Sequence, residues 1–340
     1  MATYIGIKGV EIQTIAGDPA NPLAGQVWYN TTANTMKADG KQGTGAWAAA
    51  TSIPVGLEYC GLAGIQTAAV LWGGASVPPY SSPIYQSTTF EYDGTSWTEV
   101  NAVVQACVNT GGVGTQTAAA AFGTDGPSYA GLCIEYDGTS WTAGNSRPFD
   151  SGASANFGTQ TAGVSATGYM PGANPTGNLD DVAHYDGTSW TVAGNFPAPS
   201  SASSAAGTQT AGILMGGYQP PTIIASATQT YDGTTWTAVP SMGTARYSST
   251  NGGSQTATII AGGTTTGQSA TPNTEIYNGS TWTEVGNLGT AATFQAKGFS
   301  MTAAATLAFI SAGGSNRPPG FIATVEEFTV PDATKTFTSS

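Results

Sequence analysis

Two short phrases recur along the chain at nearly the same interval, and this repeat constrains the fold more than any other feature. A phrase of the form Tyr-Asp-Gly-Thr-Ser-Trp ends at Trp97, Trp141, Trp190, Trp236 and Trp282, at spacings of 44, 49, 46 and 46 residues. The phrase Gly-x-Gln-Thr-Ala recurs at a similar interval, at Gln66, Gln116, Gln160, Gln209 and Gln255. A period of roughly 40 to 50 residues is typical of propeller repeats.

Each repeat unit contains four segments that are typical of β-strands. In one unit, a small-residue stretch (246–250) leads through Gly-x-Gln into the apolar segment 256–261. After a glycine pair and a variable loop, residues 274–277 and 282–285 flank an Asn-Gly turn. Such a turn between β-prone runs is a strong hairpin signal, because Asn and Gly tolerate the positive φ that the turn requires. Four antiparallel strands, repeated radially, predict a β-propeller.

The ends of the sequence decide the predicted number of blades. Five units are complete, and a sixth runs from about Phe294 to Phe328 without the Tyr-Asp-Gly phrase. Gly45-Ala46-Trp47 has the pattern of a fourth strand and lies 50 residues before Trp97. We expect Trp47 to complete the last blade and close the ring, in preference to the C-terminal stretch 334–338. The sequence therefore predicts an all-β, six-bladed propeller over residues 45–340, preceded by an N-terminal segment, 1–44.

The units resemble kelch repeats, in which a glycine pair ends the second strand and a Tyr and a Trp follow in the third and fourth. Glycine pairs stand at 73–74, 216–217, 262–263 and 313–314, whereas two units depart from the pattern with Gly123-Thr124 and Gly168-Tyr169. The resemblance covers about residues 45–330 and implies a kelch-like propeller. It implies little about function, because propellers host many activities.

Composition predicts a folded protein that does not bind nucleic acid or anionic membranes. Hydrophobic residues make up 40% of the chain, which is enough for a core although only 8% of residues are charged. Eight Lys and Arg residues against 20 Asp and Glu residues give a net charge of -12, which disfavours nucleic acid and anionic membranes as partners. Cys60, Cys107 and Cys133 lack metal-ligand spacing, and we expect buried thiols. We expect neither a signal peptide nor a transmembrane segment.

No residue set has the pattern of a metal or nucleophilic site, so we expect no cofactor and no enzymatic activity. His184 is the one histidine of the chain, which leaves a kelch-type copper centre and a Ser-His-Asp triad without support. Asp125 and the pair Asp180-Asp181 are candidate calcium ligands, but isolated loop carboxylates are more often solvated.

Sialidase chemistry is also disfavoured. The repeated Asp-Gly phrase is one residue shorter than the Asp-box of sialidases. Those enzymes also need an arginine cluster for the substrate carboxylate, whereas the three arginines of this chain, Arg147, Arg246 and Arg317, fall in different repeats.

Propeller topology directs the search for a binding surface to one face. The turns between strands one and two and between strands three and four share a face, and here they are the uniform Gly-x-Gln and Asp-Gly turns. The loops between strands two and three lie on the opposite face and differ among units, as binding loops on a rigid scaffold do. Tyr supplies contact area at low entropic cost and Pro limits the ordering on binding. The candidate binding residues are therefore Pro79, Tyr80, Tyr129, Tyr169, Tyr218, Pro220 and Arg317.

Residues 1–44 do not repeat and contain a predicted hairpin. Gly25-Gln26-Val27-Trp28-Tyr29-Asn30-Thr31-Thr32 resembles a phrase near the start of many phage tail and fibre proteins. The Thr/Gly/Ala-rich units also resemble kelch-like structural proteins of marine tailed phages, such as cyanophages. The resemblance implies a virion component whose segment 1–44, with Trp28 and Tyr29, anchors it to the particle while the propeller projects outward.

From this resemblance we expect a non-enzymatic tail fibre or appendage protein that is made in the host cytoplasm and carried in the virion. Its expected partners are other virion proteins, through segment 1–44, and a host-surface glycan or protein. The first alternative is an architectural decoration, collar or nozzle piece without a host ligand. The second, a carbohydrate-active enzyme, is disfavoured by the missing catalytic residues. The sequence is compatible with a homo-oligomer and leaves the assembly state open.

Overall fold

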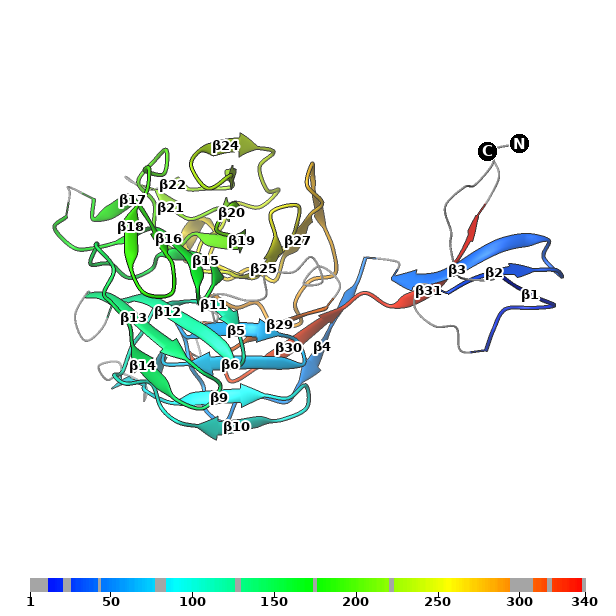
Figure 1. Ribbon diagram of the computed structural model, residues 1–340, viewed down its shortest axis with the longest axis horizontal. Helices are drawn as coiled ribbons and strands as arrows, with labels where there is room; N and C mark the ends of the chain where they lie inside the picture. The colour runs from blue at the N-terminus through cyan, green and yellow to red at the C-terminus, as the bar shows by residue number, and fades with distance from the viewer. Residues whose placement is uncertain are drawn as a thin grey trace. The chain divides into compact units, whose positions relative to one another are not determined.

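The chain forms two compact units built from β-strands (Figure 1). The computed structural model describes residues 12–20, 26–41, 44–76, 84–125, 130–173, 176–219, 223–293, 308–316 and 320–337. One unit, the large unit, comprises Ala46–Thr329, and the other, the small unit, joins Met1–Gly45 to Val330–Ser340. Apart from one short 3-10 turn, η1 (Thr266–Gln268), the regular structure of the described residues is β-strand. None of these residues forms a helix long and apolar enough to cross a membrane.

In its described part, the large unit contains five sheets of four antiparallel strands, each built from consecutive segments of the chain. The sheets are β5 (Gly61–Ile65), β6 (Ala68–Trp72), β9 (Thr89–Tyr92) and β10 (Trp97–Val100); β11 (Gly111–Thr115), β12 (Ala118–Thr124), β13 (Ala130–Tyr136) and β14 (Trp141–Ala143); β15 (Ala155–Thr159), β16 (Ala162–Tyr169), β17 (Asn178–Tyr185) and β18 (Trp190–Val192); β19 (Ser204–Thr208), β20 (Ala211–Met215), β23 (Thr228–Tyr231) and β24 (Trp236–Val239); and β25 (Thr250–Ser254), β26 (Ala257–Ala261), β27 (Thr274–Tyr277) and β28 (Trp282–Glu284). Two short strand pairs, β7 (Ala75–Ser76) with β8 (Ile84–Tyr85) and β21 (Tyr218–Gln219) with β22 (Ile223–Ile224), extend two of the loops.

The first strands of successive sheets pack against one another, which gives a β-propeller-like architecture. β5 contacts β11, and the contacts continue through β15 and β19 to β25. Figure 1 shows β5 on the inner side of its sheet and β10 at the outer edge. Glycine is required where neighbouring sheets approach closely: a Cβ on Gly112 in β11 would lie 2.1 Å from the Leu62 carbonyl oxygen, and one on Gly212 in β20 would lie 2.2 Å from the Phe157 ring. Close packing of inner strands explains much of the glycine and alanine content.

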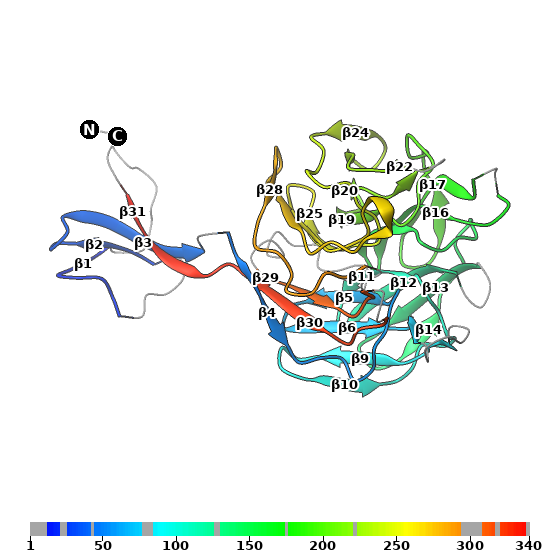
Figure 2. The ribbon, with the colours of Figure 1, turned by 180° about the vertical axis from the view of Figure 1, so that it is seen from behind.

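A further sheet joins an early segment of the chain to a late one. β4 (Ala46–Ala50) pairs antiparallel with β30 (Val325–Thr329), which pairs with β29 (Ala308–Ala312) (Figure 2). Trp47 lies opposite Phe328 in this register, with ring centroids 5.4 Å apart, and its indole also packs edge-on against Phe309 at 5.9 Å. The Trp47 Nε1–H donates to Thr274 Oγ1 at 2.9 Å in the preceding sheet.

The C-terminal strand lies in the small unit. β31 (Asp332–Phe337) pairs antiparallel with β3 (Thr35–Lys41), which continues through β2 (Val27–Asn30) to β1 (Gln13–Ile15). The predicted boundary assigned residues 330–340 to the propeller, and the structure differs there because the register of β31 runs from Met36↔Phe337 to Lys41↔Asp332. The C-terminal stretch 334–338, considered above as the strand that closes the ring, therefore has β3 as its partner over residues 334–337.

The repeated tyrosines join neighbouring sheets by hydrogen bonds. Each buried Tyr packs on the Trp of its own hairpin, as Tyr92 does on Trp97 with ring centroids 4.7 Å apart. Four of these hydroxyls also contact a side chain of the preceding sheet, at the residue just before that sheet's own repeated aromatic residue. The contacts are Tyr92 with Glu327 at 2.8 Å, Tyr136 with Glu91 at 2.9 Å, Tyr185 with Glu135 at 3.1 Å and Tyr231 with His184 at 2.9 Å. His184 thus occupies a position at which three other sheets carry glutamate.

The repeated glutamines provide a second link between sheets. The Gln116 side-chain amide donates to the Ala69 and Tyr92 carbonyl oxygens at 3.1 and 2.9 Å, both in the preceding sheet. Gln160, Gln209 and Gln255 repeat this pair of bonds. Gln66 reaches the Phe328 carbonyl oxygen at 3.3 Å, so the same link connects the β5 sheet to the sheet of β4 and β30. The Gly-x-Gln phrase therefore forms a turn and also supplies the glutamine that hydrogen-bonds to the preceding sheet.

The repeated Asp-Gly turns are stabilised within themselves. Asp93 Oδ1 accepts the backbone N–H groups of Thr95 and Ser96, each at 2.8 Å, and Gly94 adopts φ 92°. The Thr95 hydroxyl, together with these N–H groups, lowers the pKa of Asp93. Asp137, Asp186, Asp232 and Asn278 make the same backbone bonds. These carboxylates act as turn residues, as their repetition predicts.

Candidate functional site

One face of the large unit, which we call the loop-rich face, is formed where the connections between sheets meet the loops that follow each second strand. The two kinds of segment pair through isolated bridges that repeat around this face. The bridges are Glu58↔Ala75, Gly152↔Tyr169, Ser201↔Tyr218, Tyr247↔Thr264 and Thr293↔Ser315. The backbone from which each of these loops starts is therefore hydrogen-bonded to a connection between sheets.

A chain of backbone hydrogen bonds links successive sheets beside these bridges. Asn109 N–H donates to the Tyr59 carbonyl at 2.8 Å, and the series continues through Ala153, Ala202 and Ser248 at 3.2, 2.8 and 2.9 Å. All five residues are left-handed, with φ between 51° and 59°. Non-glycine residues in this region are uncommon and carry strain of about 1–3 kcal/mol each. Their repetition at equivalent places fixes the inner rim of the loop-rich face.

The structure describes two of the predicted binding residues on this face. Tyr169 and Tyr218 occupy equivalent positions in successive sheets, and both are half-buried. Sequence reasoning missed Tyr247, whose ring lies beside that of Tyr218 with centroids 5.9 Å apart and planes at 59°. Tyr247 lies in a connection between sheets, within the stretch 246–250 that the sequence analysis described only by its small residues. The large residues Arg246 and Tyr247 at the start of that stretch were the sequence signal that could have identified it. The other candidates, Pro79, Tyr80, Tyr129, Pro220 and Arg317, lie outside the described residues.

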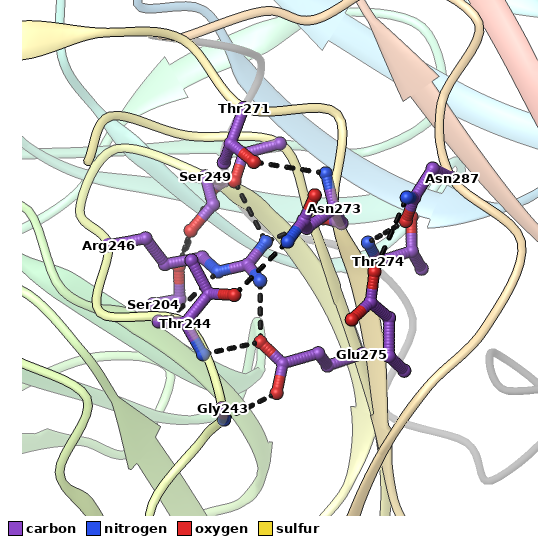
Figure 3. Close-up of polar contacts among 12 residues, drawn as sticks. Ser204, Gly243, Thr244, Arg246, Ser249, Thr271, Asn273, Thr274, Glu275 and Asn287 are labelled. Carbon is purple, nitrogen blue, oxygen red and sulfur yellow. Dashed lines mark hydrogen bonds and ion pairs between the residues drawn. The ribbon is translucent and has the colours of Figure 1, made fainter.

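A buried ion pair supports Tyr247. The Arg246 guanidinium is fully buried and donates to Glu275 Oε1 at 2.6 Å and to the Asn273 and Gly262 carbonyl oxygens at 2.6 and 3.0 Å (Figure 3). Burial lowers the pKa of Arg246. The Arg246 carbonyl in turn accepts the N–H of Gly217, the residue before Tyr218, at 2.9 Å. Arg246 thus holds the backbone beside both tyrosines.

Glu275 receives two further bonds from the same connection. Its carboxylate oxygens accept the N–H groups of Gly243 and Thr244 at 2.6 and 3.1 Å, as Figure 3 shows. Glu326 makes the matching contacts one sheet later, to Gly289 and Thr290 at 2.7 and 2.9 Å. Hydrogen bonds of this kind offset part of the cost of burying a carboxylate.

Arg147 breaks the repeat at a buried position. Six residues, one for each sheet, occupy equivalent positions. Each donates its backbone N–H to the carbonyl oxygen of the residue five places before the sheet's repeated aromatic residue, as Arg147 does to Gly131, five places before Tyr136. The other five are apolar, namely Ile53, Val103, Phe196, Met242 and Leu288, and all are buried. Burial lowers the pKa of Arg147 to about 10, so the guanidinium stays charged at neutral pH.

The Arg147 guanidinium supports the segment that carries Tyr169. Nη2 donates to the carbonyl and the hydroxyl of Ser151 at 2.6 and 2.9 Å, and Nη1 donates to the Ser165 hydroxyl. Ser151 precedes Gly152, which pairs with Tyr169. Both arginines that the structure describes in the large unit therefore fix backbone behind a half-buried tyrosine.

The remaining candidates from the sequence are His184, Asp125 and the pair Asp180-Asp181. His184 is half-buried, and its Nε2 contacts the Tyr231 hydroxyl, while burial lowers its pKa. Burial raises the pKa of Asp181, and Asp125 Oδ2 accepts the Asn109 amide at 2.7 Å. Within the described residues, no three His, Cys, Asp or Glu side chains come together as metal ligands would.

A shallow cleft of about 540 Å³ has none of Tyr169, Tyr218 and Tyr247 in its lining. It is lined by the end of β10 (Glu99, Val100), by Asn101, and by Tyr136, Gly138 and Thr139 around the β13–β14 turn. The Asn101 side-chain amide donates across this cleft to the Thr139 carbonyl at 2.8 Å. The cleft is thus part of the contact between two sheets.

The small unit buries one of the two predicted anchoring residues. Trp28 is fully buried, and its Nε1–H donates to Asp18 Oδ1 at 3.1 Å. Tyr29 is half-buried and points to the opposite side of β2, where Met36 and then Phe337 are its cross-strand neighbours. Trp28 therefore belongs to the core of this unit, and Tyr29 lies on the more exposed side.

Comparison with known proteins bears on the fold alone. No protein-family model and no curated protein matches the chain. Among solved structures the chain is similar to YjhT, with a TM-score of 0.62 and 13% sequence identity over 84% of this chain and 99% of that one. At this identity the likeness supports the β-propeller-like, all-β architecture and carries nothing about activity.

Proposed function

We propose that the large unit is a six-bladed, kelch-like β-propeller. Five sheets have four strands, and β29, β30 and β4 supply three strands of a sixth. The part of the sixth repeat unit that precedes β29, residues 294–307, lies outside the described residues. The contact of β29 with β5 and the bond from Gln66 to Phe328 support closure of the ring at this sheet.

We further propose that the protein is a non-enzymatic component of a phage virion, a tail fibre or appendage that binds a host-surface receptor. The observation that carries the binding role is the set of half-buried tyrosines on the loop-rich face, Tyr169, Tyr218 and Tyr247, each on backbone held by bridges. Preorganised aromatic side chains bind with a small loss of entropy. The virion assignment rests on the Gly-Gln-Val-Trp-Tyr-Asn-Thr-Thr phrase.

In this proposal the small unit contacts other virion proteins. Tyr29 lies in one cross-strand row with Met36 and Phe337, which are 40% and 48% exposed, and Val27 on the same side of β2 is 36% exposed. Apolar side chains gathered on one sheet face are typical of a protein–protein contact. We assign the particle contact to this face rather than to the buried Trp28.

The test is binding of fluorescently labelled protein to host cells, with and without prior removal of surface polysaccharide. Saturable binding that is lost in the triple variant Tyr169→Ala, Tyr218→Ala, Tyr247→Ala supports the proposal. The matched control is Ile65→Ala, which removes a 46% exposed side chain at the end of β5, beside the Gly-x-Gln turn, and should bind as the parent does. Absence of binding to any host would favour the architectural alternative.

A further inference from the structure

Tyr218 and Tyr247 form an aromatic corner on the loop-rich face. Their ring centroids lie 5.9 Å apart with planes inclined at 59°, and both side chains are half-buried. The two rings thus lie beside one another at an incline, and the Tyr247 hydroxyl also bonds to the Thr264 side chain. Apolar surface combined with a few convergent polar groups is the usual composition of a small-molecule site.

The backbone beneath this corner is fixed before any ligand arrives. Tyr218 and Ser201 exchange backbone hydrogen bonds at 2.8 and 3.0 Å, and Tyr247 and Thr264 do so at 2.8 and 3.1 Å. The bond from Gly217 N–H to the Arg246 carbonyl joins the two pairs. The backbone that carries the two rings is therefore ordered, which lowers the ordering cost of binding.

The charge of the large unit restricts the ligand. Of the 20 acidic residues, 16 lie in Ala46–Thr329 against four basic ones, whereas the small unit has four of each. Both basic residues that the structure describes in the large unit, Arg147 and Arg246, are buried. A carboxylated, sulfated or phosphorylated ligand would meet net repulsion here without an exposed cation among the described residues.

We propose that Tyr218 and Tyr247 form a binding site for a neutral sugar. One side of the sugar ring, which carries C–H groups, packs on a tyrosine ring, and the sugar hydroxyls exchange hydrogen bonds with the phenol oxygens. The inference rests on the proposed receptor-binding function and specifies its ligand class and its site.

The experiment measures binding of the full chain to immobilised oligosaccharides of two kinds. Neutral hexose and N-acetylhexosamine oligomers stand beside uronic-acid and sulfated oligomers. We expect saturable binding to at least one neutral oligomer and a loss of about tenfold or more in Tyr218→Ala and Tyr247→Ala, since each aromatic contact is worth about a factor of ten. Tyr85→Ala, which removes a 36% exposed tyrosine from β8, is the matched control and should bind as the parent does.

Binding to charged oligomers alone, to no neutral oligomer, or with full strength in both tyrosine variants would overturn this site. Circular dichroism of each variant shows that the sheets are intact. The outcome is distinguishable from failure of the proposed function: cell attachment that survives both substitutions keeps the receptor role and removes this site. Neutral-sugar binding that the substitutions abolish, without attachment to any host, keeps the site and removes the virion role.

Discussion

Arg246 and Glu275 form a buried ion pair between a connection and the third strand of the next sheet, with 2.6 Å between Nη2 and Oε1 and side chains that are 0% and 4% exposed. The pair is over-determined, because each partner also bonds to the backbone: Arg246 to carbonyl oxygens and Glu275 to N–H groups. It therefore ties together several segments that start or support the loops around Tyr247.

Breaking this pair from one side leaves an uncompensated buried charge. We expect Arg246→Met and Glu275→Gln each to lower the free energy of unfolding by about 3–5 kcal/mol. The double variant should cost less than the sum of the two, because neither charge remains alone. Chemical denaturation of all four proteins measures the coupling, and strictly additive losses would show that the two side chains act independently.

The repeated glutamines are expected to contribute to stability through the neighbouring sheet. Gln160→Ala removes bonds to the Ala119 and Tyr136 carbonyl oxygens at 3.1 and 2.9 Å. At about 0.5–1.5 kcal/mol for each bond, we expect a loss of about 1–3 kcal/mol in denaturant unfolding. Gln86→Ala is the control, because its amide bonds stay within its own loop, to Ser76 and Ile84. Equal losses in the two variants would contradict an inter-sheet role.

Trp47 is expected to hold the sheet of β4 and β30 together. Trp47→Ala removes packing on Phe309 and Phe328 and the bond to Thr274. Burial of a large aromatic side chain is worth about 3–5 kcal/mol, and for this half-buried one we expect a loss of about 2–3 kcal/mol. Thermal unfolding measures it, with the exposed Ala48→Ser in the same strand as control. An unchanged melting temperature, here or on deletion of residues 1–50, would contradict closure by this strand.

Asp18 makes the small unit sensitive to acid. Hydrogen bonds from Lys37, Asn30 and Trp28, in that order of effect, lower the pKa of Asp18 from 3.8 to about 2. Because the folded pKa lies below the unfolded one, the stabilisation is fully present above about pH 4 and is lost as pH falls towards 2. The NMR signal of the Trp28 indole N–H should follow this titration. In Asp18→Asn the signal should be insensitive to pH in that window, and a titration that persists there would point to another group.

The repeat was sufficient to predict the strands and turns of the large unit. The Asp-Gly turn before Trp97 and the strands on either side of it were predicted from the repeated phrase, and local chemistry alone determines them. Asp-Gly needs a turn, and alternating aromatic residues need a buried side. Equivalent residues in five units predicted the same strands and turns, so the repeat supplied five independent observations within one sequence.

Long-range partners could not be predicted in this way. Nothing in the C-terminal stretch distinguishes a strand that pairs with β3 from one that closes the ring, because both need the same alternation. Tyr247 and Arg147 were missed for a related reason: each departs from its equivalents in other units, and the meaning of that departure depends on neighbours such as Tyr218 and Ser151, which fold beside them from other segments.

The pairing of Ala46 with Thr329 has a consequence during synthesis of the protein on the ribosome. At about 5–20 residues per second, a ribosome that has made β4 needs roughly 15–60 s more to make β30. Throughout that interval β4 has no partner within its own chain, and an unpaired strand is a template for pairing with another. β3 pairs with β2 on one side, and its other side has no partner until β31 is made. During synthesis both units therefore keep an unpaired strand edge until β30 and β31, which are neighbours in the sequence, have left the ribosome.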